Sequence, residues 1–399
     1  MNGVDSRLPY YFCDMHIHIG GTNSGKPVKI TASRQMTLTR ILEEASERKG
    51  MDVIGIIDAH APEVQEELIG LLEKGAAEEH RDGGVQYKQT LLILGCEVEI
   101  KEPGRGEAHF LCYLPSVGDM RLFTDWLSRR CKNVHLSSQR IGATLRELQE
   151  RVAEGGGVLV PAHIFTPHKG LYGSCTDSLA EVADPSLIPA VELGLSANTD
   201  MADRLTELHD KTFLTNSDAH SLAKIGREYQ AIAMGERSFR EWKRALRREA
   251  GRGVAVNYGL HPQLGKYHQT ACQSCQSTLP ADAVGRCPQC GFKRVVRGVF
   301  DRIEQLADCP PGVHPPFRPP YVEQVPLEFI PGVGPRLRDR LYRAFGTEMN
   351  ILHRVGREDL AGVVGERIAD LIVQAREGRL NVKAGGAGTY GRIVTAGKA

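Results

Sequence analysis

The stretch DMHIH at residues 14–18 decides the fold, because it places two imidazoles at the end of a predicted β-strand that reads YFCDMHIHI over residues 11–19. Alternate residues of a strand point to the same side, so Asp14, His16 and His18 are predicted to share one face. Imidazole and carboxylate groups gathered in this way are typical ligands of zinc, manganese or iron. The motif therefore predicts a strand that ends in a metal site.

Six further strand-like runs follow in residues 51–220 and alternate with amphipathic helical runs at 38–49, 62–74, 119–131, 140–154 and 200–210. The alternation predicts a mainly parallel α/β fold, either a β/α barrel or a doubly wound sheet. In a β/α barrel the catalytic side chains gather at the carboxyl ends of the strands. The predicted strands read MDVIGIID (51–58), LLILGCEVEI (91–100), AHFLCYLP (108–115), GVLVPAH (157–163), AVELG (190–194) and TFLTNSDAH (212–220).

Nearly every one of these runs carries a residue that can bind a metal. If these residues served packing alone, each would need its own buried hydrogen-bond partner. Their convergence at one rim predicts a metal centre, and divalent metals that lower the pKa of a bound water to about 7 are suited to hydrolysing phosphate esters. The residues are Asp58, His60, Glu97, Glu99, His109, His163, Glu192, Asp218 and His220.

Length and composition set the class of protein. A chain of 399 residues with 41% hydrophobic residues predicts two or three folded domains. No run of about 18 apolar residues and no secretory signal is visible, so the sequence predicts a cytoplasmic protein that does not enter a membrane. The ten cysteines are spread along the chain, and no structural disulfide is expected.

The net charge of +1 is the sum of two halves of the chain that carry opposite net charges. Residues 1–220 carry 22 Lys and Arg against 32 Asp and Glu, whereas residues 221–399 carry 28 against 17. A basic carboxyl-terminal half favours a polyanionic partner, and a solvated basic surface is the alternative.

Two CxxC pairs, Cys272 with Cys275 and Cys287 with Cys290, predict a zinc ribbon. Eleven residues separate the pairs, and four thiolates suit one tetrahedral Zn²⁺ with a structural role. A redox role is disfavoured, because redox CxxC motifs occur in a βαβ context. The predicted domains are a barrel over 1–255, the ribbon with a Pro-rich linker over 265–325, and a helical tail over 326–399.

The tail contains EFIPGVGPRLRDRLYRAF at residues 328–345, which resembles a helix-hairpin-helix element. In such an element Gly332 and Gly334 would let backbone N–H groups at a helix start approach a DNA phosphate. Arg336, Arg338 and Arg340 would add positive charge beside the phosphate backbone. The tail is therefore predicted to bind DNA without reading its sequence.

DMHIH (14–18), IDAH (57–60), GCEVE (95–99), AHFL (108–111), PAHIF (161–165) and NSDAH (216–220) resemble the motifs of the PHP superfamily in order and spacing. The resemblance implies a distorted seven-stranded β/α barrel with a phosphoesterase centre of two or three metals. It implies that His16, His18, Glu97 and Asp218 hold one metal and that Glu97 bridges to a second held by His109 and His163. His60 and His220 would contribute to a third, although many members have a further His where this chain has Ser24. In this reading Asp14 supports a ligand His, and Asp58 is either a ligand or a support.

The order of barrel, ribbon and tail resembles the domain order of the endonuclease Q family. Three further motifs resemble motifs of that family: NSDAHS (216–221), GKYH (265–268) and LADCPPG (306–312). That resemblance implies metal-assisted nicking of DNA on the 5′ side of uracil, hypoxanthine, xanthine or an abasic site. The damaged nucleotide would be turned out of the helix into a pocket. Phe165 and Tyr172 are candidates to stack on its base, with packing in the core as the alternative.

The expected metals are one structural Zn²⁺ and two or three catalytic Zn²⁺, Mn²⁺ or Mg²⁺ ions. The expected partners are damaged DNA and a sliding clamp, with no nucleotide cofactor. Two other functions stay open: a PHP phosphoesterase that acts on a small phosphorylated metabolite, and a nucleic-acid-binding adaptor whose metal site has decayed.

Overall fold

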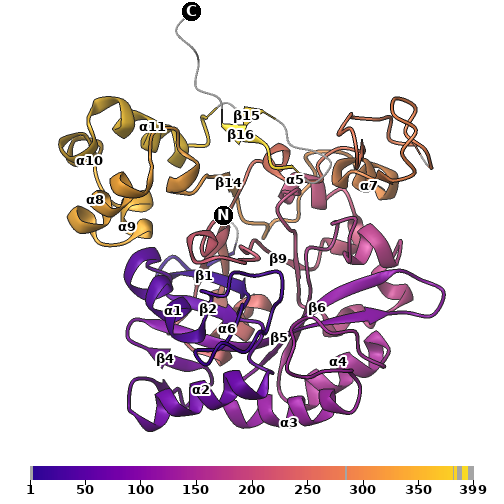
Figure 1. Cartoon of the computed structure of the whole chain (residues 1–399), viewed down its shortest axis with the longest axis horizontal. Helices are drawn as coiled ribbons and strands as arrows, with labels where there is room; N and C mark the ends of the chain where they lie inside the picture. Colours follow the sequence, from indigo (N-terminus) through magenta and orange to yellow (C-terminus); the bar gives the residue numbers. More distant parts are fainter. Residues whose placement is uncertain (1–2, 284, 381, 384–388, 394–399) are drawn as a thin grey trace, which may run out of the picture.

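A ring of β-strands forms the centre of residues 10–260 in the computed structural model, which describes residues 3–283, 285–380, 382–383 and 389–393 (Figure 1). All seven predicted strands are present, and two more complete the ring. The strands are β1 (Tyr10–Ile17), β2 (Val53–Ile56), β5 (Thr90–Lys101), β6 (Glu107–Leu114), β7 (Val158–Pro161), β8 (Ala190–Glu192), β9 (Thr212–Leu214), β10 (Tyr229–Ala233) and β11 (Gly253–Gly259).

Hydrogen-bonded ladders join the strands in the order β11-β10-β1-β2-β5-β6-β7. The parallel pair β8 and β9 contacts β7 on one side and β11 on the other, which closes the ring. Two short strands, β3 (Glu78–Glu79) and β4 (Val85–Tyr87), extend the sheet beside β5. The result is the distorted barrel that the sequence predicts.

The prediction of a mainly parallel sheet is wrong for half of this ring. The pairs β1-β2 and β2-β5 are parallel, whereas β5-β6, β6-β7, β1-β10 and β10-β11 are antiparallel. Only residues 102–106 separate β5 from β6. A parallel pair needs a crossover of a dozen or more residues, so this short connection permits only a hairpin.

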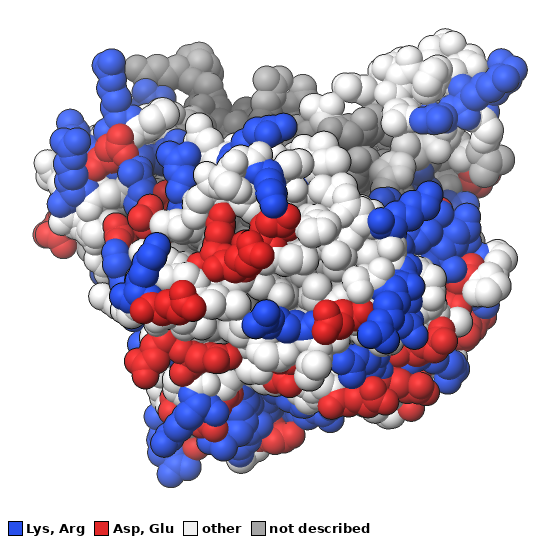
Figure 2. Space-filling view, turned by 60° about the horizontal axis from the view of Figure 1, so that its bottom comes forward, with Lys and Arg blue, Asp and Glu red and all other residues white. Residues whose placement is uncertain are grey.

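Helices cover the outside of the ring, and the helical face in the lower part of Figure 1 is formed by α2, α3 and α4. Figure 2 brings this face forward and shows Lys and Arg interspersed with Asp and Glu, with no broad field of one sign. The helices of the barrel are α1 (Leu38–Glu43), α2 (Pro62–Glu73), α3 (Val117–Ser128), α4 (Leu145–Glu154), α5 (Thr199–Ala202) and α6 (Phe239–Leu246). The predicted helix at 200–210 is only α5 and a 3₁₀ turn at Thr206–Leu208.

Helix α6 closes one end of the barrel. Its Trp242 is fully buried among inward-facing strand residues such as Met15 and Ile93, and its ring lies 4.9 Å from that of Tyr113. Burying large aromatic side chains supplies much of the free energy that holds such a core together. Because apolar side chains fill this end, polar chemistry is confined to the opposite end.

The ribbon and the tail lie on either side of that opposite end (Figure 1). The ribbon contains β12 (Ala271–Cys272) and β13 (Val295–Val296) and leads into α7 (Val299–Leu306). The Pro-rich segment contributes β14 (Tyr321–Glu323), which pairs with β11, and β11 itself crosses the predicted boundary at residue 255. The tail contains α8 (Pro335–Phe345), α9 (Glu348–His353), α10 (Arg357–Val364) and α11 (Glu366–Arg376).

A last strand pair, β15 (Val382–Lys383) with β16 (Arg392–Ile393), lies between the tail and the ribbon (Figure 1). The backbone N–H of Gly391 donates to Leu264 O at 3.0 Å, and Gln276 of the ribbon donates to Thr389 Oγ1 at 3.1 Å. The chain thus returns to the barrel after the tail helices. Among the residues that the structure describes, no helix is both long enough and apolar enough to cross a bilayer.

Candidate metal centre and substrate pocket

The two histidines of β1 reach the open end of the barrel because the strand is irregular. The register against β2 shifts between Asp14 and Ile17, so Met15 packs inside the barrel while Ile17 packs outside it. A bulge of this kind re-aims the side chains that follow it. Strict alternation, on which the prediction for this strand rests, therefore does not hold through residues 14–18.

Asp14 is buried but does not face the two imidazoles. Its carboxylate accepts hydrogen bonds from the backbone N–H groups of Ser217, at 3.0 Å, and Gly226, at 2.8 Å. These bonds hold the loop that carries Asp218 against β1. The prediction that Asp14 supports a ligand side chain needs correction, since its partners are mainly backbone amides of the opposite loop.

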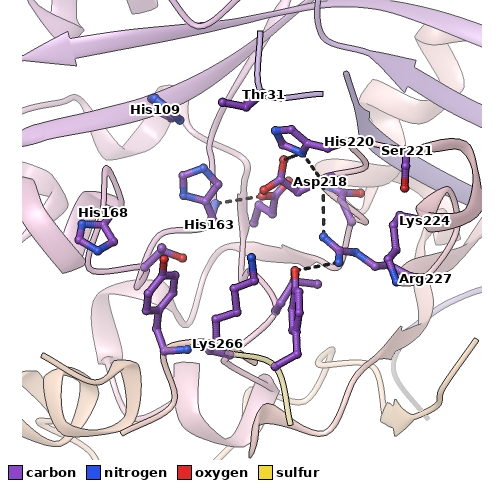
Figure 3. A pocket seen from close by; sticks show the side chains of 18 residues that line it. Thr31, His109, His163, His168, Asp218, His220, Ser221, Lys224, Arg227 and Lys266 are labelled. Carbon is purple, nitrogen blue, oxygen red and sulfur yellow. Dashed lines mark hydrogen bonds and ion pairs between the residues drawn. The ribbon is translucent and has the colours of Figure 1, made fainter. Parts of the chain in front are cut away.

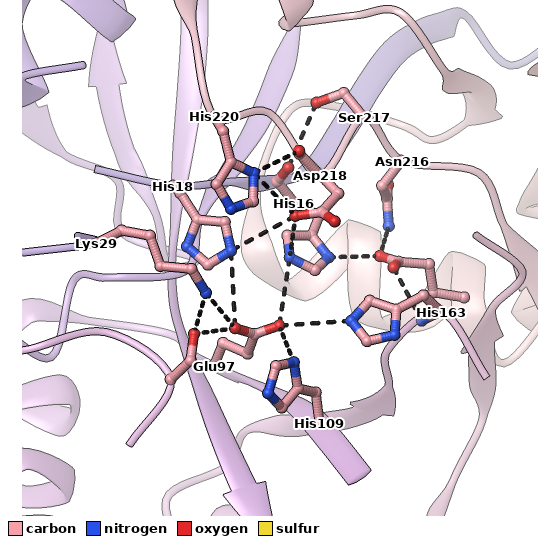
Figure 4. A network of polar contacts seen from close by, with 12 residues as sticks. His16, His18, Lys29, Glu97, His109, His163, Asn216, Ser217, Asp218 and His220 are labelled. Atoms are coloured by element: carbon pink, nitrogen blue, oxygen red, sulfur yellow. Dashed lines mark hydrogen bonds and ion pairs between the residues drawn. The ribbon is translucent and has the colours of Figure 1, made fainter. Parts of the chain in front are cut away.

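Glu97 lies at the centre of the polar cluster (Figure 4). Its Oε1 lies 3.0 Å from His109 Nδ1, 3.6 Å from His16 Nε2 and 3.7 Å from His163 Nε2. Its Oε2 lies 3.7 Å from His18 Nε2. Oε1 thus faces three imidazoles and Oε2 a fourth, and Glu97 could contribute a ligand atom both to the group of His16 and His18 and to the group of His109 and His163.

Asp218 lies beside the two imidazoles of β1 and beside His220. Its Oδ1 lies 3.4 Å from His16 Nε2 and 3.5 Å from both His18 Nε2 and His220 Nδ1. The imidazoles, with His16 foremost, outweigh the effect of burial and hold the pKa of the Asp218 carboxyl below its usual range. A carboxylate that stays ionised at neutral pH is ready to bind a cation.

Two ligand residues have a strained backbone. His163 has a φ of 30° and Asp218 a φ of 46°, which are left-handed values that residues with a side chain rarely adopt. Such strain costs about 1–3 kcal/mol and persists where the surrounding structure enforces it, often at functional sites. His163 lies two residues after β7 and Asp218 lies four residues after β9, so both turns belong to loops that follow barrel strands.

Carboxylates behind the centre orient two of the imidazoles. Glu192 Oε2 lies 2.9 Å from His16 Nδ1, and Asp58 Oδ2 lies 3.1 Å from His18 Nδ1. Although burial opposes it, the negative charge of Glu192 and Asp218 raises the pKa of His16 to about 10. A carboxylate on the far ring nitrogen leaves the other nitrogen free for a metal. Asp58 and Glu192 therefore support the ligand residues.

The residues present fit divalent metals. Three overlapping groups have ligand atoms within 4.8 Å of one another: His16 with His18 and Glu97, His18 with Asp218 and His220, and Glu97 with His109 and His163. In addition, His16 Nε2 is buried and makes no hydrogen bond. A buried polar nitrogen without a partner is costly unless it has a ligand.

His60, expected at a third metal, lies in none of these groups. Its Nε2 faces Leu136 O at 3.3 Å, and its buried Nδ1 has no hydrogen bond. Ser24 instead bonds Thr22 through its hydroxyl, at 2.9 Å. The structure therefore brings together seven of the eight predicted barrel ligands.

Sequence reasoning missed Lys29. Its ammonium group lies 3.1 Å from Glu97 Oε2 and also donates to Ser138 Oγ. A lysine in the loop GTNSGKPVKI carries no sequence signal for burial, because most lysines in such loops are exposed.

A cavity of about 530 Å³ opens beside the candidate metal ligands (Figure 3). Its lining includes His109, His163, Asp218 and His220, and its wall also carries three cations, Lys224, Arg227 and Lys266. The last side of the cavity is aromatic, formed by His168, Tyr267 and Tyr390.

The aromatic side is assembled from distant parts of the chain. The rings of His168 and Tyr267 meet edge to face at 5.3 Å. Arg227 donates to the hydroxyl of Tyr390 at 3.0 Å, and Lys266 Nζ lies 4.5 Å from the centre of the Tyr390 ring. Phe165 and Tyr172 take no such part, since both are buried in the core with their rings stacked 5.5 Å apart.

The four ribbon cysteines have the spacing of a zinc site. Sγ atoms lie 3.5 Å apart for Cys272 and Cys290 and 3.7 Å apart for Cys275 and Cys287. A tetrahedron with Zn–S bonds of about 2.3 Å has sulfur atoms about 3.8 Å apart. Among the described residues of the ribbon, the buried apolar cluster around these thiols adds Leu279, with Ala283 and Val295 packed against it. So small a cluster predicts that the module depends on a bound metal for folding.

The predicted DNA-binding residues of the tail differ in exposure. Gly332 has a φ of 89°, and Gly334 is the N-cap of α8, as expected for a hairpin before a helix. Arg336 and Arg340 are exposed, and Arg340 also donates to Val363 O, whereas Arg338 is half-buried and lies 3.5 Å from Glu328. The helix expected before the hairpin is only a 3₁₀ turn at Leu327–Phe329.

Comparison with known proteins agrees with this geometry. Residues 197–250 match the family model described as PHP-associated. The uncharacterised protein YqxK of Bacillus subtilis (strain 168) is 51% identical over 384 residues, which cover 96% of this chain and 98% of that protein. The metal-ligand barrel and the PHP-associated match place the chain in the PHP superfamily.

Two crystal structures identify the family within this superfamily. The lesion-specific endonuclease PfuEndoQ from Pyrococcus furiosus is similar with a TM-score of 0.83 and 33% identity, covering 96% of this chain and 95% of that one. Endonuclease Q bound to a 27-mer duplex with an abasic lesion at its active site gives the same TM-score and identity, covering 96% of each chain. The chain belongs to the endonuclease Q family.

Proposed function

We propose that this protein is a metal-dependent DNA endonuclease that hydrolyses a phosphodiester next to a lesion. The observation that carries the proposal is the cavity that opens directly on the metal ligands and that combines cationic with aromatic walls. Its volume of about 530 Å³ is within the range of roughly 300–1,000 Å³ typical of sites for small ligands. Such a cavity suits one nucleotide turned out of a helix.

The metal centre supplies the hydrolytic chemistry. When bound, divalent metals provide a hydroxide nucleophile near neutral pH and stabilise charge on the phosphoryl oxygens. His16, His18, Glu97 and Asp218 would hold one metal, and Glu97 with His109 and His163 would hold the second. Glu192 and Asp58 orient His16 and His18 through the far ring nitrogens.

The cations of the cavity would bind the phosphate backbone of the flipped nucleotide. Arg227 is fixed by its bond to Ser217 O at 2.7 Å, which leaves its charge at the edge of the loop that carries Asp218. Lys224 and Lys266 line the same cavity. Charged donors held in place in this way orient a phosphate without reading a base sequence.

The aromatic wall would receive the base. His168, Tyr267 and Tyr390 present ring faces and edges of the kind that stack on unpaired bases, at about 1–3 kcal/mol per base. Uracil, hypoxanthine, xanthine and abasic sites are the proposed lesions, with cleavage on the 5′ side. Extrusion costs least where pairing is already weak, which favours a damaged nucleotide over a normal one.

The tail would bind the duplex beside the lesion. Exposed Arg336 follows the hairpin of Gly332 and Gly334, and a second glycine turn at Gly365, with a φ of 82°, begins α11. Backbone N–H groups at such helix starts can contact DNA phosphates. The sliding clamp remains a predicted partner.

Substitution of Tyr267 by Ala tests the proposal against the alternative of a small phosphorylated metabolite. Nicking of a duplex with one uracil should fall by about 5- to 150-fold, since one stacking contact of about 1–3 kcal/mol is lost. Hydrolysis of bis-p-nitrophenyl phosphate should stay at the wild-type rate, because that substrate needs the metals alone. An equal loss on both substrates, or hydrolysis of small phosphate esters only, would overturn the proposal.

A further inference from the structure

Ile30 is a large apolar side chain that lies in contact with solvent, in the loop after β1. Its exposed fraction of 75% is the highest among the large hydrophobic residues that the structure describes. Val28 and Met36, which lie on either side of it in the same loop, are buried, with 2% and 0% exposed. The loop therefore keeps its other large apolar side chains inside and presents this one to water.

A tight turn places Ile30 at the mouth of the catalytic cavity. The N–H of Ala32 donates to Lys29 O at 3.0 Å, so Ile30 and Thr31 are the two central residues of a β-turn. Thr31 lines the cavity beside Asp218 (Figure 3). Ile30 does not belong to the lining, and its side chain is exposed. It therefore lies at the edge of the cavity and outside it.

Hydrogen bonds on both sides of the turn fix it to the barrel. Before the turn, the N–H of Lys29 donates to Ile19 O at 2.8 Å, two residues after β1. After the turn, the N–H of Ser33 donates to His220 O, also at 2.8 Å. Gly20 permits this close packing, because a Cβ at that position would lie only 1.9 Å from Ser33 O. The turn is thus tied both to the end of β1 and to the loop that carries Asp218 and His220.

The position of Ile30 distinguishes it from the other exposed apolar residues. Single exposed hydrophobic side chains are ordinary on protein surfaces, so exposure alone carries no argument. Among the exposed large hydrophobic residues of the described part of the chain, which include Leu122 and Phe292, Ile30 alone is next in sequence to a residue that lines the cavity. A fixed apolar side chain thus stands where duplex DNA would approach the metal ligands.

Extruding a nucleotide from a duplex leaves a gap in the base stack. Proteins that unstack DNA frequently insert an apolar side chain such as Ile, Leu, Phe or Met between the bases. Ile30 has the chemistry for this role, and its anchored turn holds it ready before DNA binds. Arg34 in the same loop is also exposed, and a cation there could contact a phosphate beside the inserted side chain.

We propose that Ile30 is a wedge that enters the base stack of duplex DNA where the lesion nucleotide has been turned out. The inserted side chain leaves water and replaces the stacking partner that the neighbouring base has lost. The inference rests on the proposed function and adds to it the residue that holds the duplex open. It also gives a physical reason for selectivity, because a wedge enters most easily where base pairing is already weak.

Nicking of the same lesion in duplex and in single-stranded DNA tests the wedge, because a single strand has no duplex stack to hold open. Ile30→Ala, Ile30→Leu and the control Leu122→Ala are compared with the wild type on one uracil-containing strand, alone and annealed to its complement. Leu122 is 60% exposed but lies on α3, which contributes no residue to the lining of the cavity. Both side chains lie in solvent, so none of these substitutions should disturb the fold.

Ile30→Ala should nick the duplex roughly 10- to 100-fold more slowly than the wild type, since the shortened side chain buries much less apolar surface in the stack. It should nick the single strand as fast as the wild type does. Ile30→Leu should keep most of the duplex rate, and Leu122→Ala should match the wild type on both substrates. An unchanged duplex rate in Ile30→Ala, or an equal loss on both substrates, would overturn the inference.

Fluorescence of 2-aminopurine placed next to the lesion gives a second measurement that needs no cleavage. Binding of the Asp218→Asn protein should brighten the probe as the stack opens, and adding Ile30→Ala to that protein should remove most of the increase. Equal brightening by both proteins would overturn the inference, even where the single strand is not cut. A wild-type protein that nicks no damaged DNA in either form would refute the proposed function, whereas the preceding outcomes with an active wild type refute the wedge alone.

Discussion

Replacing Glu348 by Gln should loosen the tail from the barrel. Glu348 Oε2 lies 2.7 Å from Lys49 Nζ, and both side chains are only 2% exposed. The carboxylate also accepts hydrogen bonds from the hydroxyl of Tyr342 at 2.9 Å and from the N–H of Leu327 at 3.1 Å. Despite burial, the Lys49 ammonium holds the pKa of Glu348 below its usual value. This buried ion pair therefore joins the barrel to the tail.

The expected loss of free energy follows from the surroundings in which the substitution leaves Lys49. Lys49 keeps its bond to Ala223 O at 2.9 Å but then faces a neutral amide in place of the carboxylate. Removing one member of a buried pair typically costs about 3–5 kcal/mol. Hydrogen exchange of the backbone amides in α8 and α9 should then accelerate by more than 100-fold, since each factor of ten corresponds to about 1.4 kcal/mol.

The neighbouring surface pair of Arg48 and Asp339 provides the matched control. Its atoms also lie 2.7 Å apart, but both side chains are 48% exposed. An exposed pair contributes only about 0–1 kcal/mol, so Asp339→Asn should change exchange by less than about 10-fold. Equal exchange in Glu348→Gln and Asp339→Asn would refute the reasoning that burial of the pair fixes the tail to the barrel.

Other consequences can be tested separately. Cys287→Ser should release the ribbon zinc and make residues 265–300 sensitive to protease, while barrel metals stay bound; a zinc-free ribbon that resists protease would contradict this. Glu192→Gln should weaken metal binding about 10–100-fold in a chelator competition, because His16 loses its orienting carboxylate, and unchanged affinity would count against that role. Burial raises the pKa of Glu228 from 4.5 to about 8, so the folded state binds an extra proton between these values and stability falls as pH rises through them. The melting temperature of Glu228→Gln should therefore be higher than that of the wild type at pH 9 but not at pH 4. A difference of the same size at both pH values would argue against a raised pKa of Glu228.

The sequence alone was sufficient to predict the parts of the site that depend on local pattern. His16 and His18 lie at the end of β1 and Asp218 lies in the loop after β9, and strand ends meet at one rim in a closed barrel, whereas Glu97 lies within the long strand β5. The ribbon cysteines are likewise a local signal. The spacing of the two CxxC pairs can be recognised without knowledge of the rest of the chain.

Other parts of the site depend on contacts between distant segments. Lys29 reaches Glu97 only because its loop packs on that of Ser138, and Tyr390 reaches the cavity only because the chain returns after the tail. Asp14 turns away from the imidazoles because β1 is irregular there, which period-two alternation does not reveal. Packing over long sequence distances decides these positions, and no local propensity encodes them.

The central claim, that the metal ligands and the adjoining cavity cut DNA at a lesion, is tested most directly by a nicking assay with mapped products. Duplexes of one sequence carry a single uracil, hypoxanthine or abasic site, or no lesion, and are incubated with Mg²⁺, Mn²⁺ or Zn²⁺. The account predicts a single nick on the 5′ side of the lesion, little cleavage of the undamaged duplex, and no cleavage by Asp218→Asn. Equal cutting of damaged and undamaged duplexes, or undiminished nicking by Asp218→Asn, would contradict it.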